Sequence, residues 1–510
     1  MTSLLVLLLL VLATGPASSQ TTSRAAVETV QAAIEGAPGT RLVSVKTSEE
    51  LAAALKSARD GVTIEGEPGA VYNGAFVAPN LPRGARAILR VRGVLPDGRV
   101  SPADSGRLFT LRAPAGAVPL TVGSGWTVDG FKLEAEGNAY GLLRVGSADG
   151  YVSAADIPQY VELRRFVIDV PEGQQERRGV MTHGGNVTIR QCWIAGVKEA
   201  GADSQAIAGW DLPGPVTVED CRLEAAGEVV MFGGADPSIK GMTPGDIQIR
   251  NNDITRPMSW RGSAWTVKNL LELKHARKVT ITGNRFSNNW AAAQGGWFAV
   301  FTPGNQNGGC PWCVVEDVTF ERNTVTNVAN GFNILGYEAK EGFVSLPTRN
   351  IVIRNNLLLI DGKRLDGDGR CFQLLDGRMS DVTLDHNTCI ADGTFLNLDA
   401  YGHGKFQRIV VTNNLARHNL YGVFGNAVGS GLPALEAMLE KPTFLKNVLA
   451  GAEGYSYPAT TLTPSLVTFQ GHFQSPETGD YRLKVTSSWR GGGTDGRDLG
   501  ADRASLEQGR

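Results

Sequence analysis

The chain has 510 residues, of which 42% are hydrophobic and 63 are glycine, and its 49 basic and 51 acidic residues give a formal net charge of −2. This composition excludes a collagen, in which glycine recurs every third residue, and a largely disordered chain, which would be less hydrophobic. The near-neutral charge creates no overall field for nucleic acid or an anionic membrane. Glycine costs about 1 kcal/mol relative to alanine inside a helix, so its abundance predicts a fold rich in turns.

The first predicted element is an apolar run, Leu4–Leu12, followed by small residues up to Ser19. The run is too short for a mature membrane span and matches the hydrophobic region of a secretory signal peptide, which we place at residues 1–19. We therefore expect a secreted protein, extracellular or periplasmic, with no membrane span in the mature chain. Residues 20–44 are predicted to be an N-terminal linker.

Residues 45–72 are predicted to form an N-terminal cap with the first strand. Thr47–Glu50 reads as a capping box, in which a Thr and a Glu three residues later satisfy the free amides of a helix start. It opens an amphipathic helix predicted over Glu49–Arg59. Val62–Ile64 follows as a strand. The end of a stack of strands needs such a cover, because an open end exposes unpaired strand edges.

An eight-residue pattern, apolar-x-apolar-x-x-[Phe/Cys/Asn]-x-apolar, dominates the rest of the chain. Ten copies begin at residues 126, 161, 187, 216, 247, 279, 318, 351, 382 and 409. The alternation at the first three positions is strand periodicity. The sixth position holds Phe131, Phe166, Cys192, Cys221, Asn252, Asn284, Asn323, Asn356, Asn387 and Asn414.

A parallel β-helix places equivalent residues above one another, one in each coil, and explains this column. The asparagines are predicted to form a structural ladder by hydrogen-bonding along the stack, at a bend where their tolerance of left-handed backbone helps. Cys192 and Cys221 are predicted to be buried ladder residues rather than ligands, and their stacking permits a disulfide without requiring one. The β-helix is placed at residues 73–485, with a short lateral helix near 432–440 and a Gly/Asp-rich tail at 486–510.

Two other features concern cysteine. Cys310 and Cys313 have CxxC spacing, but no second CxxC and no βαβ pattern accompany them. In an oxidising compartment a local disulfide that closes a loop is the favoured interpretation, with free thiols as the alternative. The state of Cys371 and Cys389 is not predicted.

The ladder and the segments VKNLLELKHARKVTITGNRFSNNW (267–290) and FTPGNQNGG (301–309) resemble the pectate-lyase-like superfamily of right-handed parallel β-helix proteins, in particular its exported bacterial members. The resemblance implies an all-β chain built as a single right-handed solenoid of about ten or more coils. It implies little about activity, since the superfamily includes lyases, hydrolases, epimerases and non-catalytic proteins.

Aromatic and basic residues gather in the middle coils. Indole faces stack on sugar rings, although the same side chains also fill loops packed against a barrel. We take as candidate substrate-binding residues Trp260, Trp265, Arg277, Arg285, Trp290, Trp297 and Tyr337, of which Tyr337 has no supporting motif.

Glu272 and Lys274 are the candidate catalytic residues, together with the adjacent His275. On a strand with Leu271 and Leu273 inward, they project from one outer face about 7 Å apart. β-Elimination on a uronic-acid polymer needs a cation at the sugar carboxylate, a base for the C5 proton and a donor for the leaving oxygen. The alternative is a surface ion pair of little energetic value.

Glu272-Leu-Lys274 resembles the chondroitinase B and alginate lyase branch of the superfamily. The resemblance implies Lys274 as the base and calcium as a candidate cofactor held by acidic residues. The sequence departs from that branch, because the strand one coil later, Trp297–Gly304, lacks the Arg-His pair. Other aspartates, near residues 366–376 and 495–502, cluster around glycines and could bind calcium, but Asp-Gly is first of all a turn signal.

The sequence therefore predicts an exported, monomeric, polysaccharide-active protein, most simply a lyase that binds an acidic polysaccharide along the middle coils. The alternative is a non-catalytic glycan-binding or surface-interaction protein. No nucleic-acid partner is expected.

Overall fold

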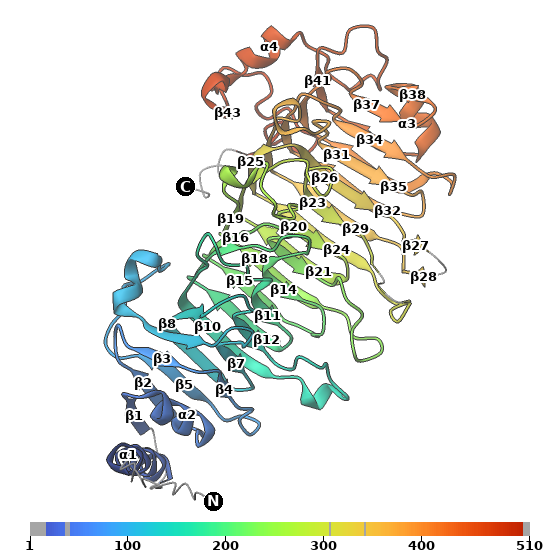
Figure 1. Cartoon of the computed structure of the whole chain (residues 1–510). Helices are drawn as coiled ribbons and strands as arrows, with labels where there is room; N and C mark the ends of the chain where they lie inside the picture. Colours follow the sequence, from blue (N-terminus) through green and yellow to red (C-terminus); the bar gives the residue numbers. More distant parts are fainter. Residues whose placement is uncertain (1–16, 36–40, 305, 307, 341–342, 503–510) are drawn as a thin grey trace, which may run out of the picture.

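The computed structural model describes residues 17–35, 41–304, 306, 308–340 and 343–502 (Figure 1). Most of the predicted signal peptide lies outside this part of the chain. The segment predicted as a linker contains a helix, α1 (Ala17–Glu35). The Arg59 side chain donates from Nε to the carbonyl of Ile34, 2.9 Å away, which fixes the end of α1. Within the described residues, no helix is both long and apolar enough to cross a membrane.

Parallel strands stack along the rod in three rows, and each middle coil contributes one segment to every row (Figure 1). Two rows, faces A1 and A2, belong to one 26-stranded sheet, and face B is a 13-stranded sheet. This arrangement confirms the predicted all-β, right-handed parallel β-helix and, at the level of fold, the resemblance to that superfamily.

Face A1 holds β1 (Arg41–Val45), β2 (Val62–Gly66), β5 (Ala87–Val91), β12 (Gly185–Arg190), β15 (Val216–Glu219), β18 (Gly245–Arg250), β21 (Ala276–Thr282), β24 (Val315–Glu321), β29 (Arg349–Arg354), β32 (Ser380–Asp385), β35 (Phe406–Thr412), β39 (Leu439–Glu440) and β40 (Thr443–Leu445). Face A2 holds β3 (Val71–Asn73), β6 (Phe109–Ala113), β13 (Trp193–Val197), β16 (Arg222–Ala225), β19 (Asp253–Thr255), β22 (Arg285–Asn289), β25 (Thr324–Val328), β30 (Leu357–Ile360), β33 (Thr388–Ile390), β36 (Leu415–Arg417) and β41 (Val448–Ala450). Two long strands, β8 (Trp126–Ala135) and β10 (Gln159–Asp169), run through both faces.

Face B holds β4 (Phe76–Ala78), β7 (Leu120–Val122), β9 (Leu143–Val145), β11 (Arg178–Thr182), β14 (Gln205–Gly209), β17 (Val230–Phe232), β20 (Leu271–Leu273), β23 (Trp297–Phe301), β26 (Asn330–Leu335), β31 (Phe372–Leu375), β34 (Leu396–Asp399), β37 (Val423–Gly425) and β38 (Gly429–Ser430). Two short antiparallel pairs lie outside the rows, β27 (Ala339–Lys340) with β28 (Phe343–Val344) and β42 (Phe473–Ser475) with β43 (Asp480–Leu483). The remaining helices are α2 (Ser48–Lys56), α3 (Leu432–Met438), α4 (Leu466–Gly471) and the 3-10 turns η1 (Pro102–Arg107), η2 (Ala154–Asp156), η3 (Met258–Trp260), η4 (Lys363–Leu365) and η5 (Pro476–Thr478).

The repeated motif forms the bend between faces A1 and A2, and its sixth residue points into the core. Asn284 donates from Nδ2 to Oδ1 of Asn323 at 3.0 Å, and its backbone N–H donates to the same oxygen at 2.9 Å. The same pairing links the other ladder asparagines from Asn252 onward, and Asn447 adds one further rung that lies outside the ten copies. One expectation is wrong: the left-handed residue is the one before each ladder residue, as at Asn251 (φ 56°) and Asn355 (φ 55°).

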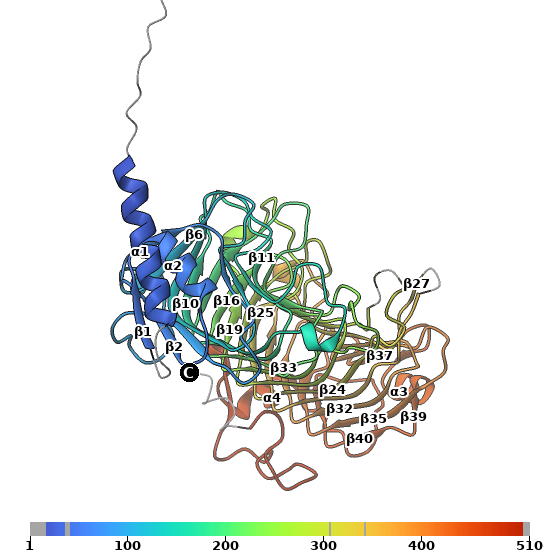
Figure 2. The ribbon, with the colours of Figure 1, turned by 90° about the horizontal axis from the view of Figure 1, so that it is seen from below.

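The N-terminal end of the stack is covered by helices, as Figure 2 shows from below. In α2, Thr47 accepts a hydrogen bond from the Glu50 amide at 3.2 Å, and Leu51 and Leu55 are buried. The lateral helix α3 lies within the segment predicted to be helical. At the other end, the segment predicted as a Gly/Asp-rich tail packs back onto face A2, where Trp489 and Leu499 join a buried cluster.

Four of the cysteines form disulfides. Cys310 and Cys313 are bonded, as their spacing predicts, and Cys371 is bonded to Cys389, which the sequence left open. Cys192 and Cys221 are buried thiols on adjacent rungs with their sulfur atoms 2.7 Å apart, in the predicted ladder positions.

Candidate functional site

The outer side of face B carries a column of side chains in strict register along the rod. Because successive residues of a strand point to opposite faces, the residues between the inward-pointing ones stack into this column. Its members in the middle and C-terminal coils are Ala208, Met231, Glu272, Val300, Asn333, Gln373 and Asn397. Apart from Glu272, the column is apolar up to Val300 and polar from Asn333 onward. Gln373 hydrogen-bonds to Asn333 and Asn397, each at 3.1 Å.

Glu272 and Lys274 lie at the outer side of β20, as the strand pattern predicts, but Glu272 is only 1% exposed. Its Oε1 atom is 3.6 Å from Nζ of Lys274, whose side chain is 33% exposed. Burial raises the pKa of Glu272 to about 7; the Lys274 charge opposes this rise, and the nearby Glu228 carboxylate adds to it. Lys274 is therefore the reachable member of the pair.

A second buried carboxylate, Glu228, lies beside Glu272, and lysines are paired with both. Lys268 places Nζ 3.3 Å from Glu228 and 2.7 Å from Asp203, while Lys274 is paired with Glu272. A calcium ion prefers six to eight oxygen ligands. It would have to displace both ammonium groups here, so these residues fit a cation poorly while the lysines stay in place.

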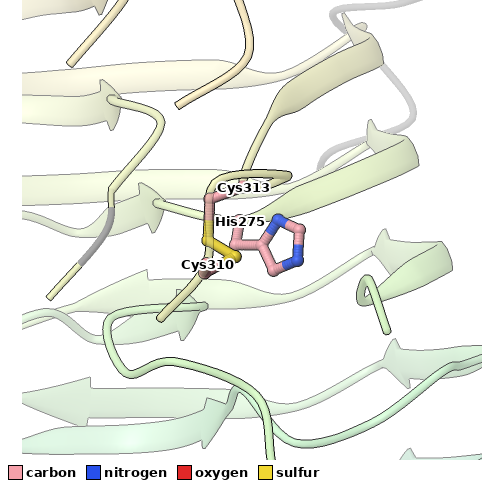
Figure 3. Close-up of side chains that lie close together, drawn as sticks. All are labelled: His275, Cys310 and Cys313. Carbon is pink, nitrogen blue, oxygen red and sulfur yellow. A yellow bond between two sulfur atoms is a disulfide. The ribbon is translucent and has the colours of Figure 1, made fainter. Parts of the chain in front are cut away.

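His275 does not belong to this outer surface. It is 1% exposed, its Nε2 atom lies 3.0 Å from the Met242 carbonyl, and its Nδ1 atom accepts the Val314 amide at 3.1 Å. Both ring nitrogens are thus committed inside the fold, which argues against the predicted catalytic role. Figure 3 shows the imidazole beside the Cys310–Cys313 disulfide. These three side chains form the only compact group of three or more His, Cys, Asp or Glu ligands among the described residues, and the disulfide removes its thiolates.

The tryptophans predicted to bind substrate are largely buried. Trp260 (9% exposed) and Trp290 (2%) belong to a small buried cluster with Val267 and Leu365, and Trp297 is also buried. Lys198 lies over the rings of Trp260 and Trp265 at 5.9 and 5.6 Å, respectively, so these rings contact a buried ammonium. Trp260, Trp265 and Trp290 therefore pack in the loops beside face B, which was the alternative interpretation of the sequence, and Trp297 opens strand β23.

The structure separates the other candidates between faces. Arg277 lies in β21 and is exposed on face A1, whereas Arg285 opens β22 on face A2. Neither shares a surface with Lys274. Tyr337 follows β26 at the edge of face B, where Arg378 lies 3.6 Å from its ring centroid.

Tyr337 leads to a polar centre at the turns that follow β26, β31 and β34. Asp376 binds Arg378 through two guanidinium nitrogens, with Nε–Oδ1 at 2.9 Å. It also faces His403, whose Nδ1 atom is 3.0 Å from Oδ2. The Asp376 side chain is 1% exposed, whereas that of His403 is 44% exposed. Tyr337, Asp376, Arg378, Tyr401 and His403 are called the Asp376 centre below.

Two glycines bring these turns together. The Gly336 amide donates to the carbonyl of Leu375, and a Cβ at Gly336 would lie 2.6 Å from the Asp376 carbonyl. A Cβ at Gly377 would lie 2.2 Å from the carbonyl of Gly404, so only glycine lets the Asp376 turn approach the His403 turn.

The electrostatics of the Asp376 centre keep its carboxylate ionised. Burial alone would raise the pKa of Asp376, but the hydrogen bonds and charge of Arg378, with a contribution from His403, lower it. Because a carboxylate only accepts, the His403 Nδ1 atom must carry the proton that it shares with Asp376. A neutral imidazole in this tautomer presents a lone pair at Nε2, and the His403 side chain is partly open to solvent.

Sequence reasoning missed Arg378 and His403. The available signal was positional: Asp376-Gly377-Arg378 and Tyr401-Gly402-His403 follow consecutive face-B strands at nearly equivalent places. The acidic groups considered for calcium are instead paired with arginines, Asp366 with Arg261 and Asp368 with Arg370. In the tail, Asp495 and Asp498 lie near Arg497 and Arg490.

No protein-family profile and no curated protein matches this sequence. Among solved structures, the chain is similar to a mannuronic acid-specific polysaccharide family 6 lyase from human gut microbiota (10% identity, TM-score 0.46, covering 84% of this chain and 93% of that one). It is also similar to the Dettilon tailspike protein (14% identity, TM-score 0.40, covering 82% of this chain and 64% of that one). A third similar structure is a family 28 exopolygalacturonase from Yersinia enterocolitica (12% identity, TM-score 0.34, covering 84% of this chain and 79% of that one). The chain thus spans about two thirds of the tailspike protein. Such distant likeness concerns the fold and assigns no chemistry.

Proposed function

We propose that this protein acts on an acidic polysaccharide as a lyase, with the Asp376 centre as its reactive site and the edge of face B as the polymer track. The observation that best supports this proposal is the arrangement of His403, Asp376 and Arg378, in which one buried carboxylate orients a partly exposed imidazole and an arginine. The proposed reactive site lies on turns two to four rungs further along the rod than Lys274, about 10 to 19 Å away.

The groups match the needs of β-elimination. Arg378 uses Nε and Nη2 for Asp376, and the remaining edge of its guanidinium can pair with the uronate carboxylate, which makes the C5 proton more acidic. The lone pair of His403 Nε2 takes that proton, the C–H electrons form the C4–C5 double bond, and the C4–O bond breaks. Burial and the charges of Asp399 and Asp376 raise the pKa of Tyr401, which keeps its half-exposed phenol protonated as a donor for the leaving oxygen.

Lys274 fits an accessory role on the same edge. A Cβ at Gly304 would lie 3.2 Å from Cδ of Lys274 and 3.5 Å from Oε2 of Glu338, so both side chains lie close to this turn, and Glu338 is the neighbour of Tyr337. A polymer that reaches the Asp376 centre would therefore pass Lys274, whose ammonium can pair with a further carboxylate of the same chain.

The test is the absorbance of unsaturated products from alginate, pectate and a glycosaminoglycan, each with calcium and with a chelator. His403→Asn keeps a donor for Asp376 and removes the basic nitrogen, so turnover should fall about 10²-fold or more. Arg378→Lys keeps the charge and removes the planar fork, so KM should rise and kcat should fall. Arg354→Lys is the matched control, because Arg354 forms an exposed pair with Glu321 on face A1; its turnover should be unchanged.

A second candidate, non-catalytic glycan binding, has one observation in its favour. Asp376 engages two nitrogens of Arg378, which weakens the cation available to a uronate. Binding of a polymer without any unsaturated product, weakened by Arg378→Lys but not by His403→Asn, would favour this candidate. No product and no binding with all three polymers would exclude both.

A further inference from the structure

Face A2 is covered at both ends and open in its middle. Over the last coils, Phe469, Phe473 and Trp489 from the C-terminal segment bury the outward residues Leu357 and Leu415. Over the first coils lies the loop between β5 and β6, which includes η1. The strands between these covers are β16, β19, β22 and β25.

The outward residues change character at this opening. Under the C-terminal cover the column reads Leu357, Thr388, Leu415 and Val448, which is mostly apolar. In the opening the register places Arg222, Asp253, Arg285 and Thr324 on successive rungs. A parallel column brings Thr255 next to Ser287, whose hydroxyls are 2.8 Å apart. If another part of the protein covered this opening, we would expect mainly apolar outward residues here too.

These side chains line a cavity of about 580 Å³, within the range of small-molecule sites. Arg99 forms one wall of the cavity, and it bonds to residues that lie more than a hundred positions later in the sequence. Its Nη1 atom donates to Asp253 at 2.7 Å, and its Nε atom donates to the Asp220 carbonyl at 3.1 Å. These bonds hold the wall rigidly in place, as a pre-formed site requires.

The cavity offers guanidinium groups to an anion. Three arginines line it, Arg99, Arg222 and Arg285, together with the two aspartates Asp220 and Asp253. Arg99 is paired with both aspartates, and Arg285 lies 3.7 Å from Asp253. The guanidinium of Arg222 lies 3.6 Å from Glu224 through Nη2, and its Nε atom makes no hydrogen bond in the described structure.

We propose that this cavity is a second binding site, for a uronic-acid unit of a saccharide. The sugar carboxylate pairs with Arg222 and Arg285, and its hydroxyls bond to Ser287, Thr326 and Asp253, the residues that line the same cavity. Alternating guanidinium, carboxylate and hydroxyl groups match a ligand that has one charge and many hydroxyls. The site lies on a different face from the Asp376 centre and does not depend on chemistry there.

The test measures binding of three probes by ligand-observed NMR: glucuronate, glucose, which lacks the carboxylate, and acetate, which lacks the sugar. All measurements use the folded Arg378→Ala protein, so that binding at the Asp376 centre is already weakened. Glucuronate should bind at least tenfold more tightly than glucose or acetate. Equal binding of acetate would reveal a simple anion site, and equal binding of glucose a neutral-sugar site; either result overturns the proposal.

Two variants locate the binding. Arg285→Ala removes a side chain that is 57% exposed, and Ser287→Tyr fills the cavity without changing charge; each should weaken glucuronate binding at least tenfold. Arg250→Ala is the matched control, because Arg250 is an exposed arginine paired with Glu219 on face A1. Unchanged binding in both cavity variants would refute the site. The proposed lyase activity is scored separately, since it responds to His403→Asn and not to Arg285→Ala.

Discussion

The Nδ1 atom of His403 lies 3.0 Å from Oδ2 of Asp376, although the two residues come from turns on different coils. Asp376→Asn should break this relationship while preserving the backbone, because Asp376 has φ 73° and asparagine tolerates left-handed geometry. The amide can no longer select the Nδ1–H tautomer or hold Arg378 ionically. We expect turnover to fall about 10²-fold and acid stability to change as well.

The stability effect has a defined sign. The pKa of Asp376 is lowered in the folded protein, so its ionised form stabilises the fold above the ordinary carboxyl range, and this contribution is lost as pH falls below about 4. Urea unfolding of Asp376→Asn should therefore show a weaker loss of stability on acidification than the unmodified protein. A variant with normal turnover and an identical pH profile would contradict the role given to Asp376.

Glu272 should give the opposite pH dependence. Its pKa is raised to about 7 by burial, so the folded state keeps a proton that the unfolded chain loses near pH 4.3. The contribution of Glu272 to stability is therefore present at low pH and falls as pH rises from about 4.3 to about 7, by at most about 4 kcal/mol. Glu272→Gln should remove this slope in urea unfolding measured across that range.

Two other buried groups make the comparison with the unmodified protein essential. Burial also raises the pKa of Glu176 to about 7, which adds a slope of the same sign. Burial lowers the pKa of His183 to about 3, aided by Arg144 and Arg178, which gives a slope of opposite sign over part of the range. Both remain in Glu272→Gln, so the difference between the two proteins isolates Glu272; no difference would show that its carboxyl titrates normally.

The sequence predicted the fold far better than the site, and the reason is physical. Each ladder residue occupies the same environment in its coil, so Asn252 to Asn414 repeat a signal that any one asparagine would carry weakly. The Asp376 centre has no such repetition, because Asp376 and His403 meet through the stacking of two turns. The burial of Trp290 likewise depends on loops of other coils, and sequence clustering alone could not distinguish it from an exposed platform.

The ladder itself should carry measurable stability. Asn323 accepts two hydrogen bonds from Asn284 and donates to the carbonyls of Ile281 and Glu321. Asn323→Ala leaves several buried groups unpaired and should lower the free energy of unfolding by about 3 kcal/mol. Asn73→Ala, an exposed asparagine in a strand, is the control and should change it by less than about 0.5 kcal/mol. Similar losses in both variants would show that the ladder contributes no special stability.

The two disulfides should differ in what they contribute. A cross-link stabilises mainly by restricting the unfolded chain, and the effect grows with the length of the closed loop. Cys371–Cys389 closes a separation of 18 residues and Cys310–Cys313 a separation of 3, which corresponds to about 3 and about 1.5 kcal/mol, respectively. All four cysteines are buried, so replacing each pair with alanines carries a comparable packing loss. Denaturant unfolding should therefore rank Cys371→Ala/Cys389→Ala as the less stable variant, and the reverse order would mean that local packing around Cys310 outweighs loop entropy.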